Sequence, residues 1–173
     1  MGYTTLEMEI ALMSHFDIRR NLIVPCVTNW IDLVRFESDL VILSASNYAT
    51  IIEIKVSKSD LKNDLNKRHL NGNFEYYFKG VKYFYYAVPD HLEGDALNQI
   101  PDYAGLLIVK KGSKKFTYGR GYEYDKIQTI RNPKCLFATK WTDKQRYELA
   151  RLGTLRILGL KKNIQSNKEL NKR

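Results

Sequence analysis

Length, composition and charge set the first limits on this protein. The chain has 173 residues, of which 44% are hydrophobic and 27% are charged, an ordinary composition for a globular protein. This length favours a single domain with a core of its own, which we place over residues 1–160. No apolar run approaches the roughly 20 residues that span a bilayer, and the first residues lack the basic and apolar regions of a signal peptide. We therefore expect a cytoplasmic protein with no membrane partner.

The formal net charge of +9 indicates a polyanionic partner. Residues 161–173 hold five basic side chains and one acid, and they have few apolar groups to bury. We expect this segment to be a flexible basic tail. The smaller positive charge that remains on the body suits phosphate binding, but it also suits an ordinary solvated surface. Charge alone therefore does not select a function.

The first predicted element is an amphipathic helix over residues 4–16. Thr4 and Glu7 have the spacing of a capping box. The apolar residues at helical spacing, which we expect to face the core, are Leu6, Ile10, Met13 and Phe16. Glu9 lies at the margin of that face. It either reaches solvent or reaches a functional site from the helix, and the pattern does not decide between the two.

Strands follow the helix, and a second helix separates them. Residues 21–28 indicate a strand that is interrupted by Pro25. Residues 38–44 and 50–56 indicate a β-hairpin, and residues 57–68 a polar helix capped by Ser57. The later elements are strands at 81–88 and 105–109, a turn at 110–115 leading to a strand at 116–118, and a helix at 142–158.

This order of elements predicts an α/β fold. The strand at 50–56, the helix at 57–68 and the strand at 81–88 form a β-α-β unit, whose two strands should pair in parallel. The preceding hairpin is antiparallel. The result is a mixed central sheet flanked by helices, with an αβββαβ core.

Two acids and a lysine interrupt strands that are otherwise apolar. Glu53 and Lys55 are two residues apart, so their side chains share one face of the strand. With an odd number of residues in the hairpin loop, Asp39 lies opposite one of them on that face. Such a cluster can be a cross-strand salt bridge. It can also be an oxygen-ligand site for Mg²⁺ with an ammonium beside it to stabilise an anion.

The arrangement resembles the PD-(D/E)XK nuclease superfamily. In that superfamily an acid on the second strand and Glu-x-Lys on the third form the signature, and here these are Asp39 and Glu53-Ile54-Lys55. Residues 53–64, 83–89 and 100–109 look more specifically like the MmcB-like branch of DNA-repair and phage proteins. The resemblance covers roughly residues 4–110. It departs from the pattern at Ser38, where the family name has proline, and in lacking a Gln-x-x-x-Tyr sequence on the second helix.

The resemblance implies a restriction-endonuclease-like fold and a Mg²⁺-dependent DNA phosphodiester hydrolase of a repair or phage pathway. Asp39, Glu53 and Lys55 would be catalytic. Asp39, Glu53 and the Ile54 carbonyl oxygen would hold Mg²⁺, for which Mn²⁺ can substitute, and Glu9 is a further candidate ligand. The alternatives are a nucleic-acid-binding module with little or no catalysis and a protein–protein adaptor in which the cluster is structural.

Basic residues near this cluster are the candidates for contacting the DNA backbone. They lie on the second predicted helix, and they are Lys58, Lys62, Lys67 and Arg68. As a solvated helix face they would need no special role. The sequence leaves the oligomeric state open, a homo-oligomer included.

Overall fold

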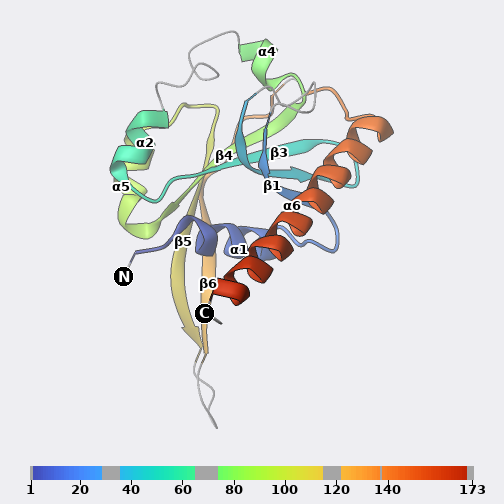
Figure 1. Ribbon diagram of the computed structural model, residues 1–173. Coiled ribbons are helices and arrows are strands. Elements are labelled where there is room, and N and C mark those ends of the chain that lie inside the picture. The colour runs from blue at the N-terminus through green and yellow to red at the C-terminus, as the bar shows by residue number, and fades with distance from the viewer. Residues whose placement is uncertain (1, 29–35, 65–73, 115–121, 137, 171–173) are drawn as a thin grey trace.

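The computed structural model describes residues 2–28, 36–64, 74–114, 122–136 and 138–170 (Figure 1). The helices over these residues are α1 (Thr5–His15), α2 (Lys58–Asp64), α4 (Phe74–Phe78), the 3₁₀ helix η1 (Asp90–Leu92), α5 (Glu93–Gln99) and α6 (Asp143–Leu170). The strands are β1 (Leu22–Val27), β2 (Ser38–Leu43), β3 (Ala49–Ile54), β4 (Val81–Pro89), β5 (Gly105–Lys114) and β6 (Tyr122–Arg131).

The strands form one mixed sheet in the order β1-β2-β3-β4-β5-β6. Pairing is antiparallel from β1 to β3, parallel from β3 to β5, and antiparallel between β5 and β6. The predicted α/β class, the αβββαβ order and the parallel pairing across the β-α-β unit are confirmed. No helix in the described ranges is long and apolar enough to cross a membrane.

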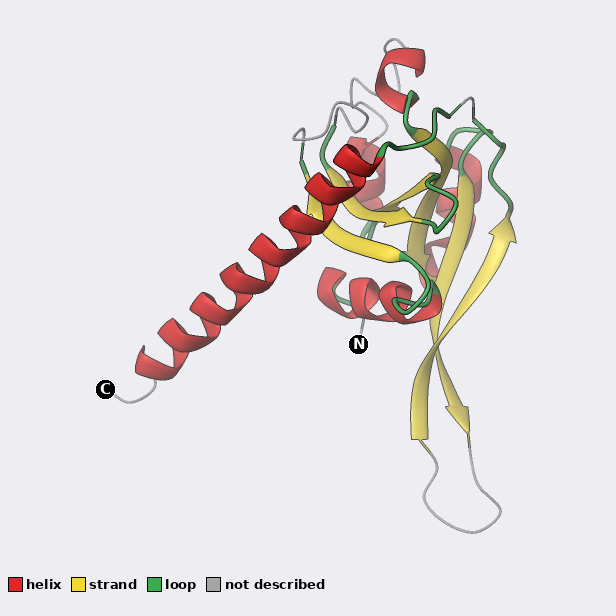
Figure 2. Cartoon of the chain, turned by 90° about the vertical axis from the view of Figure 1, so that its right-hand side faces the viewer, coloured by secondary structure: helices red, strands yellow, loops and turns green. Residues whose placement is uncertain are grey.

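Helices cover both faces of the sheet (Figures 1 and 2). One face packs against α1, whose buried residues Met8 and Leu12 join Ile52 and Ile54 of β3 in a single apolar cluster. The other face packs against α2, α4, α5 and the first half of α6. The residues that those four helices contribute to the second cluster include Leu61, Phe78, Ala96, Leu149 and Leu152. Asp39 and Glu53 alternate along their strands with Leu40, Ile52 and Ile54 of the first cluster, so the polar site lies on the second face, at the strand ends.

Helix α1 begins as predicted but buries a different face. The Thr4 side chain accepts a hydrogen bond from the Glu7 backbone, and the Glu7 carboxylate accepts one from the Thr4 backbone. The buried residues of α1 are Met8, Ala11 and Leu12, whereas Leu6 and Ile10 are 63% and 55% exposed. The predicted core stripe is therefore wrong at its first two positions. Apolar residues occur on two sides of this helix, so its periodicity alone cannot choose which side faces the sheet.

The end of the sheet also differs from the prediction. Residues 110–114, assigned to a turn, continue β5 and pair with β6 in a long hairpin that extends beyond the rest of the sheet (Figure 2). Lys111 and Asp125 face each other across this hairpin, with 2.8 Å between the ammonium and the carboxylate. Its polar side chains give no apolar alternation, which is why the pattern suggested a turn. The strand predicted at 116–118 lies outside the described residues.

Helix α6 is longer than predicted. It was expected to end at residue 158 and to be followed by a flexible tail, but it continues to Leu170 and carries the chain away from the body (Figure 2). Its first half is anchored by the buried residues Leu149 and Leu152, and the side chains from residue 157 to residue 167 are all exposed. The outer half continues the helical hydrogen bonding that the packed first half has already begun, so it needs no nucleation of its own.

Candidate functional site

The register of the β2–β3 hairpin brings the predicted acids together. Leu40 pairs with Ile52, and the pairing continues as Val41 with Ile51. The next pair in the same register would place Asp39 opposite Glu53, so the two side chains share a face of the sheet. The Asp39 carboxylate is also fixed by the next strand, because its Oδ2 accepts a hydrogen bond from the backbone N–H of Ile54 at 2.7 Å.

The ammonium of Lys55 lies at the centre of the cluster. Its Nζ is 3.0 Å from Glu53 Oε2, 3.7 Å from Asp39 Oδ2 and 3.1 Å from Asp64 Oδ1. Lys55 is 4% exposed and Glu53 1%, whereas the Asp39 side chain is 34% exposed and opens the cluster toward solvent. The structure therefore brings together all three side chains that were predicted to be catalytic, and it adds a third carboxylate.

The surrounding acids keep Lys55 charged. Burial alone would lower the pKa of Lys55, but the carboxylates of Glu53, Asp64 and Asp39 outweigh burial and raise the pKa above its ordinary value. Lys55 is consequently a hydrogen-bond donor and a positive charge at neutral pH, and it is unsuited to act as a base. Three carboxyl groups thus surround one ammonium.

Asp64 is the member of the cluster that sequence reasoning missed. It comes from α2, whose first turn is capped by Ser57 Oγ accepting from the Asp60 N–H. Asp64 is buried, and its Oδ2 accepts a hydrogen bond from the Tyr86 hydroxyl at 2.7 Å. Burial and the Asp64 charge together raise the pKa of Tyr86. Helical spacing could have predicted this burial, because Asp64 is three residues beyond the apolar Leu61 and therefore lies on the same side of α2.

Glu9 approaches the cluster from α1. It is half-buried, and burial together with the nearby charge of Asp39 raises its pKa. Glu37, the other acid at the start of β2, is exposed. Glu9 is thus within electrostatic range of the site, while its role as a metal ligand stays a prediction.

An arginine that the sequence did not single out also lies at this end of the sheet. Arg156 of α6 donates a hydrogen bond to the carbonyl oxygen of Cys26 near the end of β1. The charges of Glu9, Asp39 and Arg156 all act on the Cys26 thiol, whose pKa is raised chiefly by burial. These residues come from four separate elements, so no local pattern could have grouped them.

The predicted DNA-contacting residues are only partly described. Lys58 forms an ion pair with Asp95 of α5, with 2.8 Å between Nζ and Oδ2, and Lys62 is exposed on α2. Lys67 and Arg68 lie outside the described residues. Lys62 is therefore available to an external anion, whereas Lys58 already neutralises a carboxylate of this chain.

The donor set suits a hard cation without forming a finished metal site. In the described part of the chain, no group of three or more His, Cys, Asp or Glu side chains is arranged to hold a metal ion. The Lys55 ammonium lies among the acids instead. Carboxylate oxygens are nevertheless the ligands that Mg²⁺ prefers. Asp39 and Glu53 would be its side-chain ligands, with the Ile54 carbonyl oxygen as predicted.

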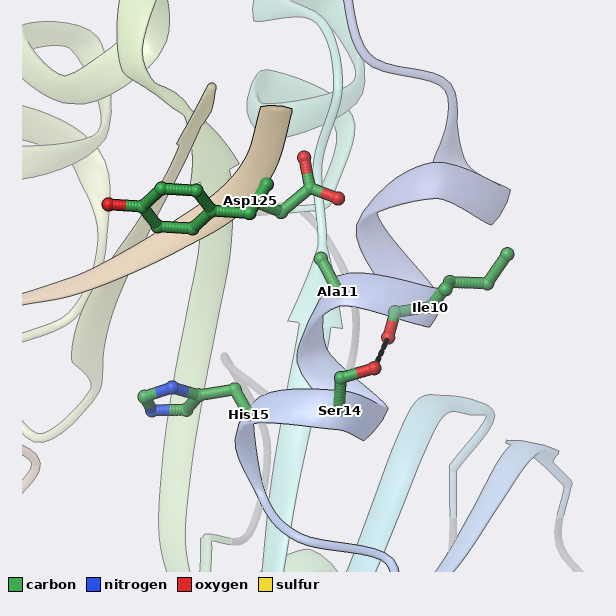
Figure 3. Close-up of a pocket in the computed structure, with 6 residues that line it drawn as sticks. Ile10, Ala11, Ser14, His15 and Asp125 are labelled. Carbon is green, nitrogen blue, oxygen red and sulfur yellow. Dashed lines mark hydrogen bonds between the residues drawn. The ribbon is translucent and has the colours of Figure 1, made fainter. Parts of the chain in front are cut away.

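A separate hollow lies between α1 and β6 (Figure 3). Its lining residues include Ser14, His15 and Asp125, which are types that occur in nucleophilic active sites. Here the Ser14 hydroxyl donates to the Ile10 carbonyl oxygen at 2.9 Å, and Asp125 accepts from both Tyr3 and Lys111. Because Ser14 and Asp125 form these bonds within the fold, we assign no catalytic role to this hollow.

Comparisons with known proteins support the fold and assign no family. No protein-family model matches the chain, and no curated protein matches it significantly. Among solved structures, the chain is similar to the SPO1766 protein of unknown function from Silicibacter pomeroyi, with a TM-score of 0.54 and 15% sequence identity. The similarity covers 93% of this chain and 90% of the other. It shows a shared fold over nearly the whole length.

Proposed function

We propose that this protein is a Mg²⁺-dependent DNA phosphodiester hydrolase of the PD-(D/E)XK type, resembling the MmcB-like branch. The observation that carries the proposal is the convergence of Asp39, Glu53 and Lys55 at the ends of β2 and β3. The Lys55 ammonium is 3.7 Å from the Asp39 carboxylate and 3.0 Å from the Glu53 carboxylate. The αβββαβ order around that cluster and the net charge of +9 also support it.

Each residue of the cluster has a distinct part in the proposed reaction. Asp39 and Glu53 supply anionic oxygen ligands, and the Mg²⁺ they would bind supplies positive charge to the phosphodiester. Asp39 lies on the solvent-exposed side of the site, from which a phosphate can approach. Lys55 remains an ammonium, so it donates hydrogen bonds to the attacking water or to the phosphate and stabilises the negative charge that develops there. Asp64, whose carboxylate accepts a hydrogen bond from Tyr86, holds Lys55 in place.

One observation favours the alternative of a nucleic-acid-binding module without catalysis. The Lys55 ammonium already lies between the carboxylates that would take up the metal ion, at 3.0 Å from Glu53 and 3.1 Å from Asp64. In that alternative the cluster is a structural ion network, and the positive charge of the protein serves DNA binding alone. Metal dependence separates the two functions.

The test combines cleavage with metal binding. Plasmid, single-stranded and branched DNA are incubated with Mg²⁺ or Mn²⁺, with EDTA as the negative control, and the melting temperature is measured with and without each metal. The nuclease proposal expects cleavage that EDTA abolishes, together with a rise in melting temperature on adding metal. Loss of cleavage is expected in Asp39→Asn and Lys55→Met, but only Asp39→Asn should also lose the thermal shift.

Asp102→Asn is the matched control for these variants. Asp102 is an exposed acid whose removal leaves the cluster intact, so its cleavage and its thermal shift should equal those of the wild type. DNA binding without cleavage or any metal-induced shift would establish the non-catalytic alternative. Absence of salt-dependent DNA binding as well would reject both and favour the adaptor.

A further inference from the structure

Basic side chains gather around Tyr48, at the end of the sheet opposite the acid cluster. Tyr48 directly precedes β3, whose other end carries Glu53. The ammonium of Lys82 lies 4.2 Å from the centre of the Tyr48 ring, and the ammonium of Lys140 lies 5.5 Å from the same centre. Lys82 is also 5.4 Å from the centre of the Tyr83 ring. Two lysines that are far apart in the chain therefore share one aromatic ring.

Hydrogen bonds bring separate segments of the chain together around this ring. The N–H of Thr139 donates to the carbonyl oxygen of Lys79 at 2.9 Å, and the N–H of Trp141 donates to the carbonyl oxygen of Asn47 at 2.8 Å. In the first turns of α6, Arg146 Nη1 donates to Asn47 Oδ1 at 3.4 Å. We call the following five residues the Tyr48 patch: Tyr48, Lys79, Lys82, Lys140 and Arg146.

The Tyr48 patch carries positive charge without carboxylate partners. Three of its four cations are exposed, and Lys82 is half-buried. In the part of the chain that the structure describes, none of the four is within ion-pair distance of an acid. The segments that build the patch are residues 44–50, 79–83 and 136–146, and they contain five basic residues and one acid, Asp143.

The neighbouring strand ends do not cancel this charge. On the β5 side, Lys134 donates its N–H to the carbonyl oxygen of Tyr103, which follows Asp102, so this side adds one charge of each sign. On the β1 side, Asp17 is already paired with Arg20, with 3.3 Å between carboxylate and guanidinium. The positive charge around Tyr48 is thus a local excess.

Two ammonium groups at one ring favour the binding of an anion. A single lysine over an aromatic ring needs no further explanation. Lys82 and Lys140, however, are like charges that repel each other across the ring, and an anion between them would remove that repulsion. The two rings beside Lys82 also restrict its side chain, so ordering it on binding costs less than for an unrestrained surface lysine.

We propose that the Tyr48 patch is a second DNA-contact surface, which binds the phosphate backbone of DNA held at the acid cluster. The identity of the anion rests on the proposed function. Lysine and arginine side chains that lack acid partners are the usual contacts to a phosphate backbone. Five residues of β3 separate Tyr48 from Glu53, roughly 17 Å at about 3.3 Å per residue. A duplex of about ten base pairs, at about 3.4 Å each, is long enough to reach both.

The test is DNA affinity measured in EDTA, by fluorescence anisotropy with a labelled duplex at several salt concentrations. The doubly substituted Lys82→Gln, Lys140→Gln protein should bind about tenfold more weakly, and the magnitude of its salt slope should fall by about 2. The matched control is Lys110→Gln, Lys126→Gln. It removes the same charge from paired positions of the β5–β6 hairpin, and its affinity and slope should stay close to those of the wild type.

Tyr48→Leu tests the ring separately from the charge. It keeps every cation of the patch, so the salt slope should stay unchanged, while the affinity should fall about two- to tenfold because Lys82 must then be ordered on binding. An unchanged affinity would overturn the part assigned to the ring. Far-UV circular dichroism and thermal melts check that every variant folds.

Other outcomes overturn the proposal. Equal losses in the patch variant and the hairpin control would show an effect of net charge alone. A patch variant that keeps its DNA affinity but no longer binds phosphatidylglycerol vesicles would assign the patch to a lipid surface. A wild type that binds no DNA would remove the proposed ligand. No readout here needs cleavage, so a protein that binds DNA through the patch without cutting it would overturn the nuclease proposal alone.

Discussion

At the scale of single residues, the acid cluster combines one open carboxylate with buried ones. Asp39 is 34% exposed, whereas Asp64 has no exposed side-chain area and contacts both Lys55 and Tyr86. A buried charge that loses its partner is costly, while a partly exposed one can be rescued by water. The two acids should therefore respond differently to removal.

We expect Asp64→Ala to lower the free energy of unfolding by about 3–5 kcal/mol, because it takes a buried carboxylate from Lys55 and Tyr86. Asp39→Ala should cost only about 1 kcal/mol, because water can replace it at the Ile54 N–H. Urea denaturation of both variants in EDTA measures the difference. Equal losses would show that Asp39 is as structural as Asp64 and would weaken the case for a metal site.

The pH dependence of stability tests Glu9. Burial and the charge of Asp39 raise its pKa above the ordinary 4.5, so the folded protein holds this proton more tightly than the unfolded chain does. The resulting stabilisation is complete below the unfolded pKa and is lost as pH rises through the folded one. Glu9→Gln should thus be more stable than the wild type at pH 7, with the gain vanishing below about pH 4.

The same substitution probes metal binding. If Glu9 contributes to a Mg²⁺ site, adding Mg²⁺ should stabilise the wild type more than Glu9→Gln. The stability advantage of Glu9→Gln that is measured in EDTA should therefore shrink when Mg²⁺ is present. Chemical denaturation with and without Mg²⁺ at neutral pH gives both numbers. A Glu9→Gln protein less stable than the wild type at pH 7 would show that the carboxylate has a favourable partner.

At the scale of elements, α6 has two halves with different tasks. Leu149 and Leu152 pack into the core, while every side chain from residue 157 to residue 167 is exposed. The outer half therefore contributes little to the folding of a single chain.

Truncation after Leu160 should leave the melting temperature of the monomer nearly unchanged. It removes five basic residues and one acid, so nonspecific DNA affinity and its salt slope should both fall. Leu149→Ala is the contrasting variant, and it should cost about 2–5 kcal/mol because Leu149 is fully buried. Thermal melts at low protein concentration measure both. A large loss of stability on truncation would mean that the outer helix packs on the body after all.

At the scale of the whole molecule, the net charge of +9 should govern DNA affinity. Released counterions make the logarithm of the binding constant fall linearly with the logarithm of salt concentration. Fluorescence anisotropy with a labelled duplex at several salt concentrations measures the slope of this line. Lys62→Gln removes at most one phosphate contact, so it should reduce the magnitude of the slope by about 1 or less. A binding constant indifferent to salt would exclude backbone recognition and, with it, both DNA-directed functions.

The αβββαβ order, the parallel β-α-β unit and the meeting of Asp39, Glu53 and Lys55 could all be predicted from the sequence. These follow from local periodicity and from a hairpin whose short loop sets its register. Which side of α1 is buried, how far β5 extends and that Asp64 joins the cluster depend instead on the tertiary fold. The physical reason is that each depends on contacts between elements far apart in the chain. Leu6 and Met8 are both apolar, and the position of α1 on the sheet determines that Met8 is buried and Leu6 exposed.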